Sequence, residues 1–161
     1  MDDFPNLKNP FHFLATLGGI GKIPLAPGTF GSIFSWLIFI FLSHFVNMFY
    51  VTFIGIFLSI WICEMASKNL IHKDHRSIVI DELIGIWIAL LPVLYLADTQ
   101  KERIVYAIAA LLFFRLIDIF KPFPVSYFDE NFKNGTGIVI DDLIAGVMAI
   151  IPSYIILTLL A

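Results

Sequence analysis

The sequence has few cysteines and few charged residues, and these shortages exclude several classes of protein. It contains one cysteine, Cys63, which excludes a disulfide framework and any CxxC redox or zinc motif. Only 14% of its 161 residues are charged, and a net charge of −3 leaves no basic surface for nucleic acid. No cleavable signal is evident, because Asp2 and Asp3 stand near the start and no sustained apolar run begins before about residue 30.

The chain is instead rich in apolar sequence. Hydrophobic residues make up 59% of it and the mean hydropathy is +0.89, whereas a soluble domain is typically about 45–50% apolar. A helix needs roughly 20 residues to cross the hydrocarbon core of a bilayer. The sequence therefore predicts an all-α, polytopic membrane helix bundle of about five transmembrane helices, in one domain over residues 1–161; four helices plus a half-helix is the alternative. The apolar runs fall at about 32–46, 48–66, 83–97, 104–120 and 143–161.

The basic residues predict which side of the membrane each end faces. If all five runs cross, the N-terminal segment and the loops at 67–82 and 121–142 share one side. The other side has only Lys101 and Arg103. Because positive charge marks cytoplasmic loops, we expect a cytoplasmic N-terminus and a C-terminus outside. The basic residues of the cytoplasmic side are Lys8, Lys22, Lys68, Lys73, Arg76, Lys121 and Lys133.

A seven-residue segment occurs twice, sixty residues apart. Residues 78–84 are Ile-Val-Ile-Asp-Glu-Leu-Ile, and residues 138–144 are Ile-Val-Ile-Asp-Asp-Leu-Ile. Each places an adjacent acidic pair, Asp81-Glu82 or Asp141-Asp142, before a long apolar run, and both pairs fall on the predicted cytoplasmic face. Two helix–loop–acidic pair–helix units in parallel indicate an internal repeat.

The acidic pairs have two interpretations. Carboxylates in the first turn of a helix interact favourably with its macrodipole, so each pair could simply cap a helix. Two pairs on one face favour a shared cation, because two carboxylates about 4 Å apart repel by roughly 4 kcal/mol at an effective dielectric constant near 20. Oxygen ligands select Mg²⁺, Ca²⁺ or Mn²⁺ over zinc, and His72 and His75 match no zinc motif.

Three charged residues, Arg115, Asp118 and Lys121, recur every three positions near the end of the fourth apolar run. That spacing places them along one side of a helix. One interpretation is an intrahelical ion pair, with Lys121 extending to the interface. The other puts Asp118 among the metal ligands and directs Arg115 and Lys121 at an anionic head group. Glu64, near the end of the second run, is a further candidate.

Residues 14–32 hold five of the ten glycines, a density that permits close approach of the backbone to a ligand. The segment is not a P-loop, since the GxxxxGK[ST] spacing fails and Ile23 follows Lys22. Thr29 and Ser32 are candidate N-caps of the first apolar helix. A helix N-terminus with Lys22 nearby would suit a phosphate; a tight re-entrant turn packed against helices is the alternative.

Four motifs follow one another along the chain. They are Ala26-Pro27-Gly28-Thr29…Gly31-Ser32, Asp74…Ile78-Val79-Ile80-Asp81-Glu82…Gly85, Phe114-Arg115…Asp118…Lys121-Pro122…Pro124 and Gly135…Gly137-Ile138…Asp141-Asp142…Ala145-Gly146. Together, in this order, they resemble the phosphatidylglycerophosphatase A family of bacterial membrane phosphatases. The resemblance extends through nearly the whole chain. Thr136 and the Phe-rich spans depart from the family pattern, but neither removes a charged residue of a motif.

The resemblance implies Mg²⁺-dependent hydrolysis of phosphatidylglycerophosphate, a phospholipid of the bilayer, to phosphatidylglycerol and phosphate. It implies a multi-pass protein of the bacterial inner (cytoplasmic) membrane with a cytoplasmic active site. Attack by water and an aspartyl-phosphate intermediate both stay open. The expected site residues are Asp81, Glu82, Asp141 and Asp142 as metal ligands that also act in catalysis, Asp118 as a further catalytic residue, and Lys22, Thr29, Arg115 and Lys121 around the substrate phosphate.

Two other functions use similar residues. A CDP-alcohol-type phosphatidyltransferase also needs aspartates and Mg²⁺, but its Asp-Gly…Ala-Arg…Gly…Asp…Asp spacing is missing from this sequence. A cation transporter could use the acidic repeats as a translocation site. The predicted position of the acids at helix starts, rather than at mid-membrane depth, argues against transport.

Overall fold

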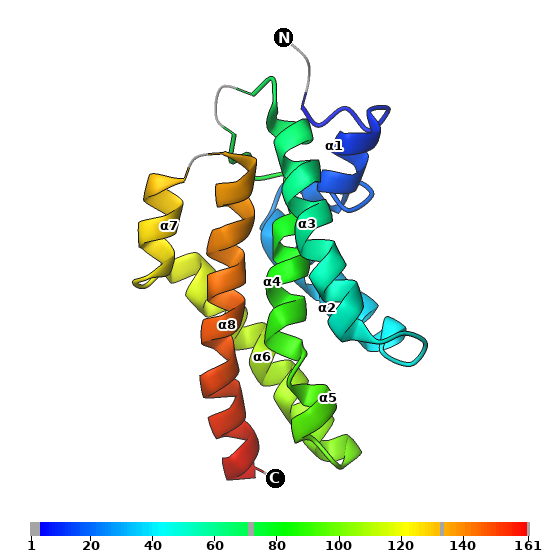
Figure 1. Ribbon diagram of the computed structural model, residues 1–161, viewed down its shortest axis with the longest axis vertical. Helices are drawn as coiled ribbons and strands as arrows, with labels where there is room; N and C mark the ends of the chain where they lie inside the picture. The colour runs from blue at the N-terminus through cyan, green and yellow to red at the C-terminus, as the bar shows by residue number, and fades with distance from the viewer. Residues whose placement is uncertain (1–3, 71–72, 133, 161) are drawn as a thin grey trace.

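Figure 1 shows the computed structural model, which describes residues 4–70, 73–132 and 134–160. All regular structure in these ranges is helical, which confirms the expected all-α class. His72 and Lys133, which entered the predictions of metal type and orientation, lie outside the described residues. The elements are α1 (Pro10–Ala15), the 3₁₀ turn η1 (Ile20–Lys22), α2 (Pro27–Leu42), α3 (Met48–Ser67), α4 (Ile80–Leu90), α5 (Val93–Leu96), α6 (Gln100–Phe120), α7 (Val125–Asn131) and α8 (Gly135–Leu160).

Local sequence explains where several helices begin. The side chain of Asn47 accepts a hydrogen bond from the Phe49 N–H and caps α3. At the start of α6, Thr99 and Glu102 form a reciprocal capping box. The third apolar run is interrupted, because Pro92 has no N–H to donate and separates α4 from the short α5.

The two similar heptapeptides lie at different depths in their helices. Asp81 and Glu82 occupy the first turn of α4, as expected. The expectation is wrong for Asp141 and Asp142, because α8 begins earlier, at Gly135, where the side chain of Glu64 accepts a hydrogen bond of 2.8 Å from the Gly135 N–H. The second pair therefore does not cap its helix.

Helix α8 is central to the packing and contacts α3, α4, α6 and α7. It packs closely against α4: a Cβ placed on Gly146 would clash with the backbone of Gly85. Two indoles fix the position of α2, since Trp36 Nε1 donates to the Ala107 carbonyl (2.8 Å) and Trp87 Nε1 donates to the Ser35 carbonyl (2.9 Å). These bonds join α2 to α6 and α4.

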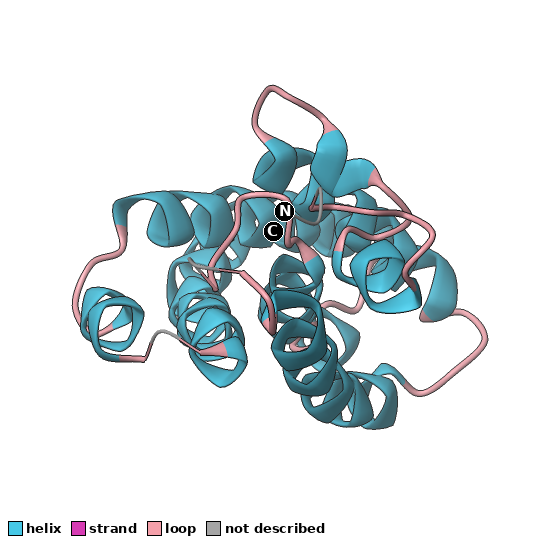
Figure 2. Ribbon diagram, turned by 90° about the horizontal axis from the view of Figure 1, so that it is seen from above, coloured by secondary structure: helices cyan, strands magenta, loops and turns pink. Residues whose placement is uncertain are grey.

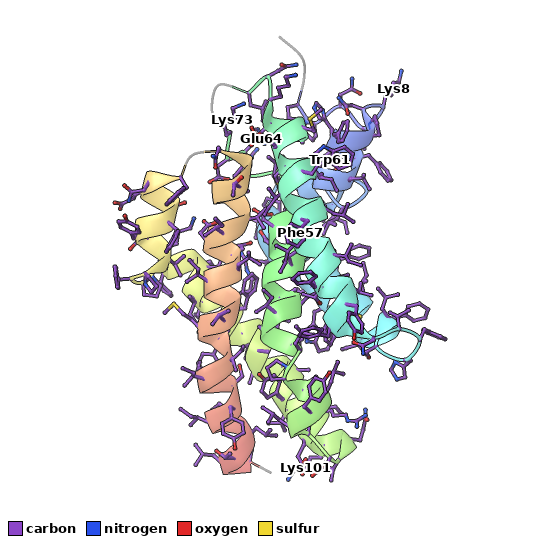
Figure 3. All side chains as sticks on the ribbon, viewed as in Figure 1. Lys8, Phe57, Trp61, Glu64, Lys73 and Lys101 are labelled. Carbon is purple, nitrogen blue, oxygen red and sulfur yellow. The ribbon has the colours of Figure 1, made fainter. Side chains whose placement is uncertain are left out.

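The main helices run along the long axis in alternating directions, and several are seen nearly end-on in Figure 2. Helices α3 and α6 run toward the end that carries α1 and α7, whereas α4 and α8 run away from it. Lys8 and Lys73 lie at that end and Lys101 lies at the opposite one (Figure 3). These three lysines are thus separated along the long axis, and the orientation in a membrane stays a prediction.

Two of the described helices, α3 and α8, are long and apolar enough to cross a membrane, and α2 is a shorter apolar helix. Large apolar side chains on these helices are exposed, including Phe57 (61%) and Trp61 (55%) on α3, both labelled in Figure 3, and Ile151 (68%) on α8. Many large exposed apolar side chains on such helices are typical of an interaction with lipid or with another protein.

Candidate active site

A cavity of about 730 Å³ opens where α2 and α4 begin and α6 ends. The loop before α4, the helix α7 and the first turns of α8 complete its walls. Both acidic pairs contribute to it, so residues sixty positions apart in the sequence lie around one space. The charged lining residues are Lys73, Asp74, Arg76, Asp81, Glu82, Arg115, Asp118, Lys121, Asp129, Asp141 and Asp142.

The crossing of α4 and α8 brings one acid of each pair together. A Cβ on Gly85 would lie 2.8 Å from the carbonyl oxygen of Asp142, and a Cβ on Gly146 would clash with Gly85. Asp81 lies four positions before Gly85, and Asp142 lies four positions before Gly146. Residues four apart share a helix face. Asp81 and Asp142 therefore lie one turn above the crossing, on the faces that meet.

Asp81 and Asp142 are also the acids with unused oxygens. Asp81 Oδ1 and Asp142 Oδ2 are buried and have no hydrogen-bond partner among the described residues. The two residues are only 9% and 3% exposed. A buried carboxylate oxygen without a partner costs free energy, so each such atom needs a physical explanation.

The other acid of each pair is held by a cation from the end of α6. Glu82 Oε2 accepts a hydrogen bond from Ser32 Oγ (2.7 Å) and lies 3.2 Å from Arg115 Nη1. Any side chain on Gly28 would displace Glu82 Oε1, so this glycine provides the space for the carboxylate. The expectation that Thr29 or Ser32 caps α2 is wrong: Ala26 is the N-cap, and the Ser32 hydroxyl is used inside the helix bundle.

Arg115 keeps part of its guanidinium available. Nη1 donates to Asp118 Oδ2 at 2.7 Å, which matches the predicted ion pair three positions along the helix. Arg115 Nε is buried without a partner among the described residues. Arg115 Nη2 lies 3.0 Å from where a Cβ of Gly28 would be, beside the start of α2. The guanidinium thus joins α6 to α2 and retains donors at the cavity.

Lys121 adopts a left-handed conformation (φ 42°) at the C-terminus of α6. Its Nζ lies 2.7 Å from Asp141 Oδ2 and 2.5 Å from Asp129 Oδ1. Partial burial alone would lower the pKa of this amine, but its bonds to Asp129 and Asp141 outweigh burial and hold the pKa above its ordinary value. Lys121 is therefore a fixed positive charge between α7 and α8.

The first turn of α2 presents backbone donors to the same cavity. Pro27, Gly28 and Thr29 all line it. The N-cap is Ala26, whose side chain cannot accept a hydrogen bond, and it adopts a left-handed conformation (φ 50°). The N–H groups of Gly28 and Thr29 are in the first turn, where no earlier carbonyl of the helix can accept from them. These donors suit an anion.

Two residues considered from the sequence lie elsewhere. Lys22 is exposed in η1 and is not part of the cavity lining. Glu64 is used to cap α8 rather than to line the cavity. Four charged lining residues were not predicted as site residues: Lys73, Asp74, Arg76 and Asp129. The sequence pattern is only weak evidence that these residues belong to a site, because charged residues in polar segments between apolar runs are usually solvated.

The donor set of the cavity fits a hard divalent cation only in part. Among the described lining residues, seven are acidic and four are basic, an excess of three negative charges that would repel a phosphate. The available donors are oxygens, as Mg²⁺ prefers. In the described ranges, no group of three or more His, Cys, Asp or Glu side chains is placed so that it could hold a metal ion by itself. The two unpartnered carboxylate oxygens fit an ion that completes its coordination with water and phosphate.

Comparison with known proteins agrees with this chemistry. The family model described as "Phosphatidylglycerophosphatase A" matches residues 13–157. A protein of that name from Escherichia coli (strain K12) is 38% identical over 146 residues, which are 89% of this chain and 81% of the relative. A protein of the same name from Haemophilus influenzae is 37% identical over 152 residues, 92% of this chain and 90% of the relative.

A third relative, from Bacteroides thetaiotaomicron, is named as a candidate phosphatidylinositol-3-phosphatase. It is 34% identical over 155 residues, which are 90% of this chain and 94% of the relative. No solved structure matches the chain. All three names describe phosphoric monoester hydrolases that act on lipids. On its sequence, the chain belongs to the phosphatidylglycerophosphatase A family of phosphoric monoester hydrolases.

Proposed function

We propose that this protein hydrolyses phosphatidylglycerophosphate to phosphatidylglycerol and phosphate, in a Mg²⁺-dependent reaction at the cytoplasmic face of a bacterial inner membrane. The observation that carries the proposal is the meeting of both acidic pairs in one cavity, where the buried and unpartnered carboxylate oxygens belong to Asp81 and Asp142. The family of the chain supplies the reaction and the substrate class.

Asp81 and Asp142 are the proposed metal ligands on α4 and α8. Glu82 and Asp141, which the sequence placed in the same role, are already bound to Arg115 and Lys121. We assign them to holding these two cations beside the metal. When bound, Mg²⁺ would neutralise the excess negative charge, polarise the phosphoryl oxygens and lower the pKa of a bound water.

The remaining donors of the cavity bind the phosphate. Arg115, Lys121, Gly28 and Thr29 line the same cavity as the acids, and they offer two side-chain cations and two first-turn N–H groups as donors. Charge-assisted hydrogen bonds of this kind stabilise the charge that develops on the phosphoryl oxygens. Lys22, exposed outside the cavity, has no part in this arrangement.

Asp118 is the proposed general base. Its Oδ2 is held by Arg115, and its Oδ1 has no hydrogen-bond partner among the described residues. Oδ1 can therefore accept a proton from the attacking water while the P–O bond to the terminal glycerol breaks, and the protonated Asp118 can then give this proton to the glycerol oxygen that leaves. The product lipid keeps its other phosphate, the diester that joins the two glycerols.

The membrane arrangement belongs to the same proposal. Five crossing segments would be α2, α3, α4 with α5, α6 and α8, with the cavity end in the cytoplasm. The exposed apolar faces, and the separation of Lys8 and Lys73 from Lys101, support it (Figure 3). The opposed directions of α3 and α4, matched by α6 and α8, are what a parallel helix–loop–acidic pair–helix repeat requires (Figure 1). The acyl chains could then stay in the bilayer while the head group enters the cavity.

The test is phosphate release from a panel of lipids by the full-length protein in detergent micelles, with Mg²⁺ or with EDTA. We expect release from phosphatidylglycerophosphate that needs Mg²⁺ and falls at least 100-fold in Asp81→Asn and in Asp142→Asn. Glu130→Gln is the matched control, because Glu130 is an exposed carboxylate outside the cavity. Undiminished Mg²⁺-dependent release by both aspartate variants would reject the site.

The Bacteroides relative gives a specific reason to include phosphatidylinositol 3-phosphate in the panel. That lipid carries a phosphomonoester on an inositol ring instead of a glycerol. If phosphate is released faster from phosphatidylinositol 3-phosphate than from phosphatidylglycerophosphate, the proposed substrate is wrong, whereas the proposed chemistry of the site stands.

A further inference from the structure

Arg76 lies on a short segment that forms one wall of the cavity. The segment is fixed on both sides of Arg76: the Ile78 N–H donates to the His75 carbonyl (2.7 Å), and the Val79 N–H donates to the Ala15 carbonyl (2.9 Å). The backbone of Ser77 packs so tightly against Gly21 that any side chain on Gly21 would clash with it. The backbone around Arg76 is therefore anchored to the N-terminal segment.

Four cations line the cavity within the described part of the chain, and three of them are occupied. Arg115 is bound to Glu82 and Asp118, and Lys121 is bound to Asp129 and Asp141. Lys73 Nζ donates to the carbonyls of Ser67 (3.0 Å) and Lys68 (2.9 Å) at the end of α3. Arg76 makes no hydrogen bond or ion pair among these residues. Its guanidinium is exposed, yet it belongs to the cavity wall.

The exposure of the lining residues distinguishes the floor of the cavity from its rim. Asp81 and Asp142 are buried at 9% and 3% exposure, and they mark the floor where the reacting phosphate must lie. Arg76 is exposed and marks the rim. The proposed substrate has two phosphates: the terminal monoester, which reacts, and an internal diester nearer the acyl chains. A head group inserted monoester first places the diester toward the rim.

We propose that Arg76 binds the internal phosphodiester of the substrate and so makes the enzyme selective for lipids with two phosphates. The inference rests on the proposed function and extends it to head-group selectivity. A guanidinium suits this role because its planar fork makes two parallel hydrogen bonds to a phosphate. The diester does not react, so the contact is the same in substrate and product.

The test compares wild type with Arg76→Gln and Arg76→Lys in mixed micelles of phosphatidylglycerophosphate. Loss of a charge-assisted hydrogen bond should raise the apparent KM about tenfold in Arg76→Gln and less in Arg76→Lys, with kcat changed less than about twofold. Inhibition by the product phosphatidylglycerol, which keeps the diester, should weaken by the same factor. Inhibition by inorganic phosphate, which occupies the floor, should not change. Lys68→Gln removes an exposed lysine outside the cavity and should behave as wild type.

The outcomes separate the two proposals. If wild type releases no phosphate from the lipid, the proposed function fails and the assignment of Arg76 fails with it. If wild type is active and Arg76→Gln keeps the wild-type KM and product inhibition, only the assignment is wrong. The assignment is also wrong if inhibition by phosphatidylglycerol and inhibition by inorganic phosphate weaken equally. That result would mean that the positive charge of Arg76 attracts any anion to the cavity.

Discussion

The close crossing of α4 and α8 leads to a prediction that separates activity from stability. Gly146→Ala adds one methyl group where the nearest atoms belong to the backbone of Gly85 and cannot rotate away. The helices must therefore move apart at the crossing, one turn below Asp81 and Asp142. Overpacking of this kind typically costs about 1–3 kcal/mol, and replacing glycine by alanine inside a helix returns about 1 kcal/mol.

The expected net loss of stability is thus small, about 0–2 kcal/mol, but the effect on the reaction is larger. A displacement of about 1 Å at catalytic groups can lower a rate about 100-fold. We expect Gly146→Ala to lower kcat for phosphatidylglycerophosphate by at least tenfold and to raise the Mg²⁺ concentration needed for half-maximal rate. Phosphate release and thermal unfolding in the same detergent would measure the two effects separately.

Gly55→Ala is the matched control, since it is also a glycine inside a helix facing α4. A Cβ there would lie 2.8 Å from Ile84 Cδ1, the end of a flexible side chain that can move. This variant should keep wild-type kcat and Mg²⁺ dependence. The reasoning is refuted if Gly146→Ala has wild-type kinetics, or if both variants lose activity in proportion to their loss of stability.

Three further predictions concern the polar contacts and the chemistry. Ser32→Ala removes the hydrogen bond to Glu82 and should lower the free energy of unfolding by about 1.5–3 kcal/mol, measured by thermal unfolding; an unchanged melting temperature would contradict this. Lys121→Met should destabilise the protein by leaving Asp141 unpaired, and adding Asp141→Asn should recover part of the loss, with a coupling of about 1–3 kcal/mol in the double-mutant cycle. Purely additive effects would show that the ion pair is not coupled. In single-turnover hydrolysis in ¹⁸O-labelled water, the label should enter phosphate directly; label in a carboxylate of the protein would instead show an aspartyl-phosphate intermediate.

Much of the fold could be predicted from apolar patterning, because long apolar runs form helices wherever a turn or proline does not interrupt them. Helix α3 spans the second run closely, and Asn47 marks its start in the sequence as it does in the structure. The start of α8 has a local signal that apolar patterning does not reveal, since Asn134 Oδ1 accepts a hydrogen bond from the Gly137 N–H (2.8 Å). A second contact at this end comes from another helix, because Glu64 accepts a hydrogen bond from the Gly135 N–H, and tertiary contacts of this kind leave no local signal.

The sequence predicts which residues make up much of the candidate site, but it does not predict which role each of them has. The acidic pairs, Arg115 and Lys121 all line the cavity. Whether they hold a metal or a phosphate remains a prediction. The ion pair of Lys121 with Asp129 was not foreseen, because the chain reverses direction after α6 and only the folded structure shows that this carboxylate of α7 faces the amine.

The adjacency of the two acids in each pair has a physical reason. Neighbouring residues on a helix point about 100° apart, so two adjacent carboxylates on α4 cannot both face α8. One of them, Asp81, lies on the face that meets α8, and the other, Glu82, reaches Arg115 on α6. On α8 the order of the two acids is the opposite. The second acid, Asp142, lies on the face that meets α4, and the first, Asp141, reaches Lys121.

This reversal follows from the register of the crossing. The two heptapeptides align Asp81 with Asp141, but Gly85 aligns with Ala145, and the glycine that meets α4 is Gly146. The contact face of α8 is therefore shifted by one residue relative to the heptapeptide alignment. An adjacent pair tolerates this shift, because either member can take the central position while its neighbour binds a cation. A single acid in each repeat would have left one helix without a carboxylate at the centre, which explains why the motif carries two.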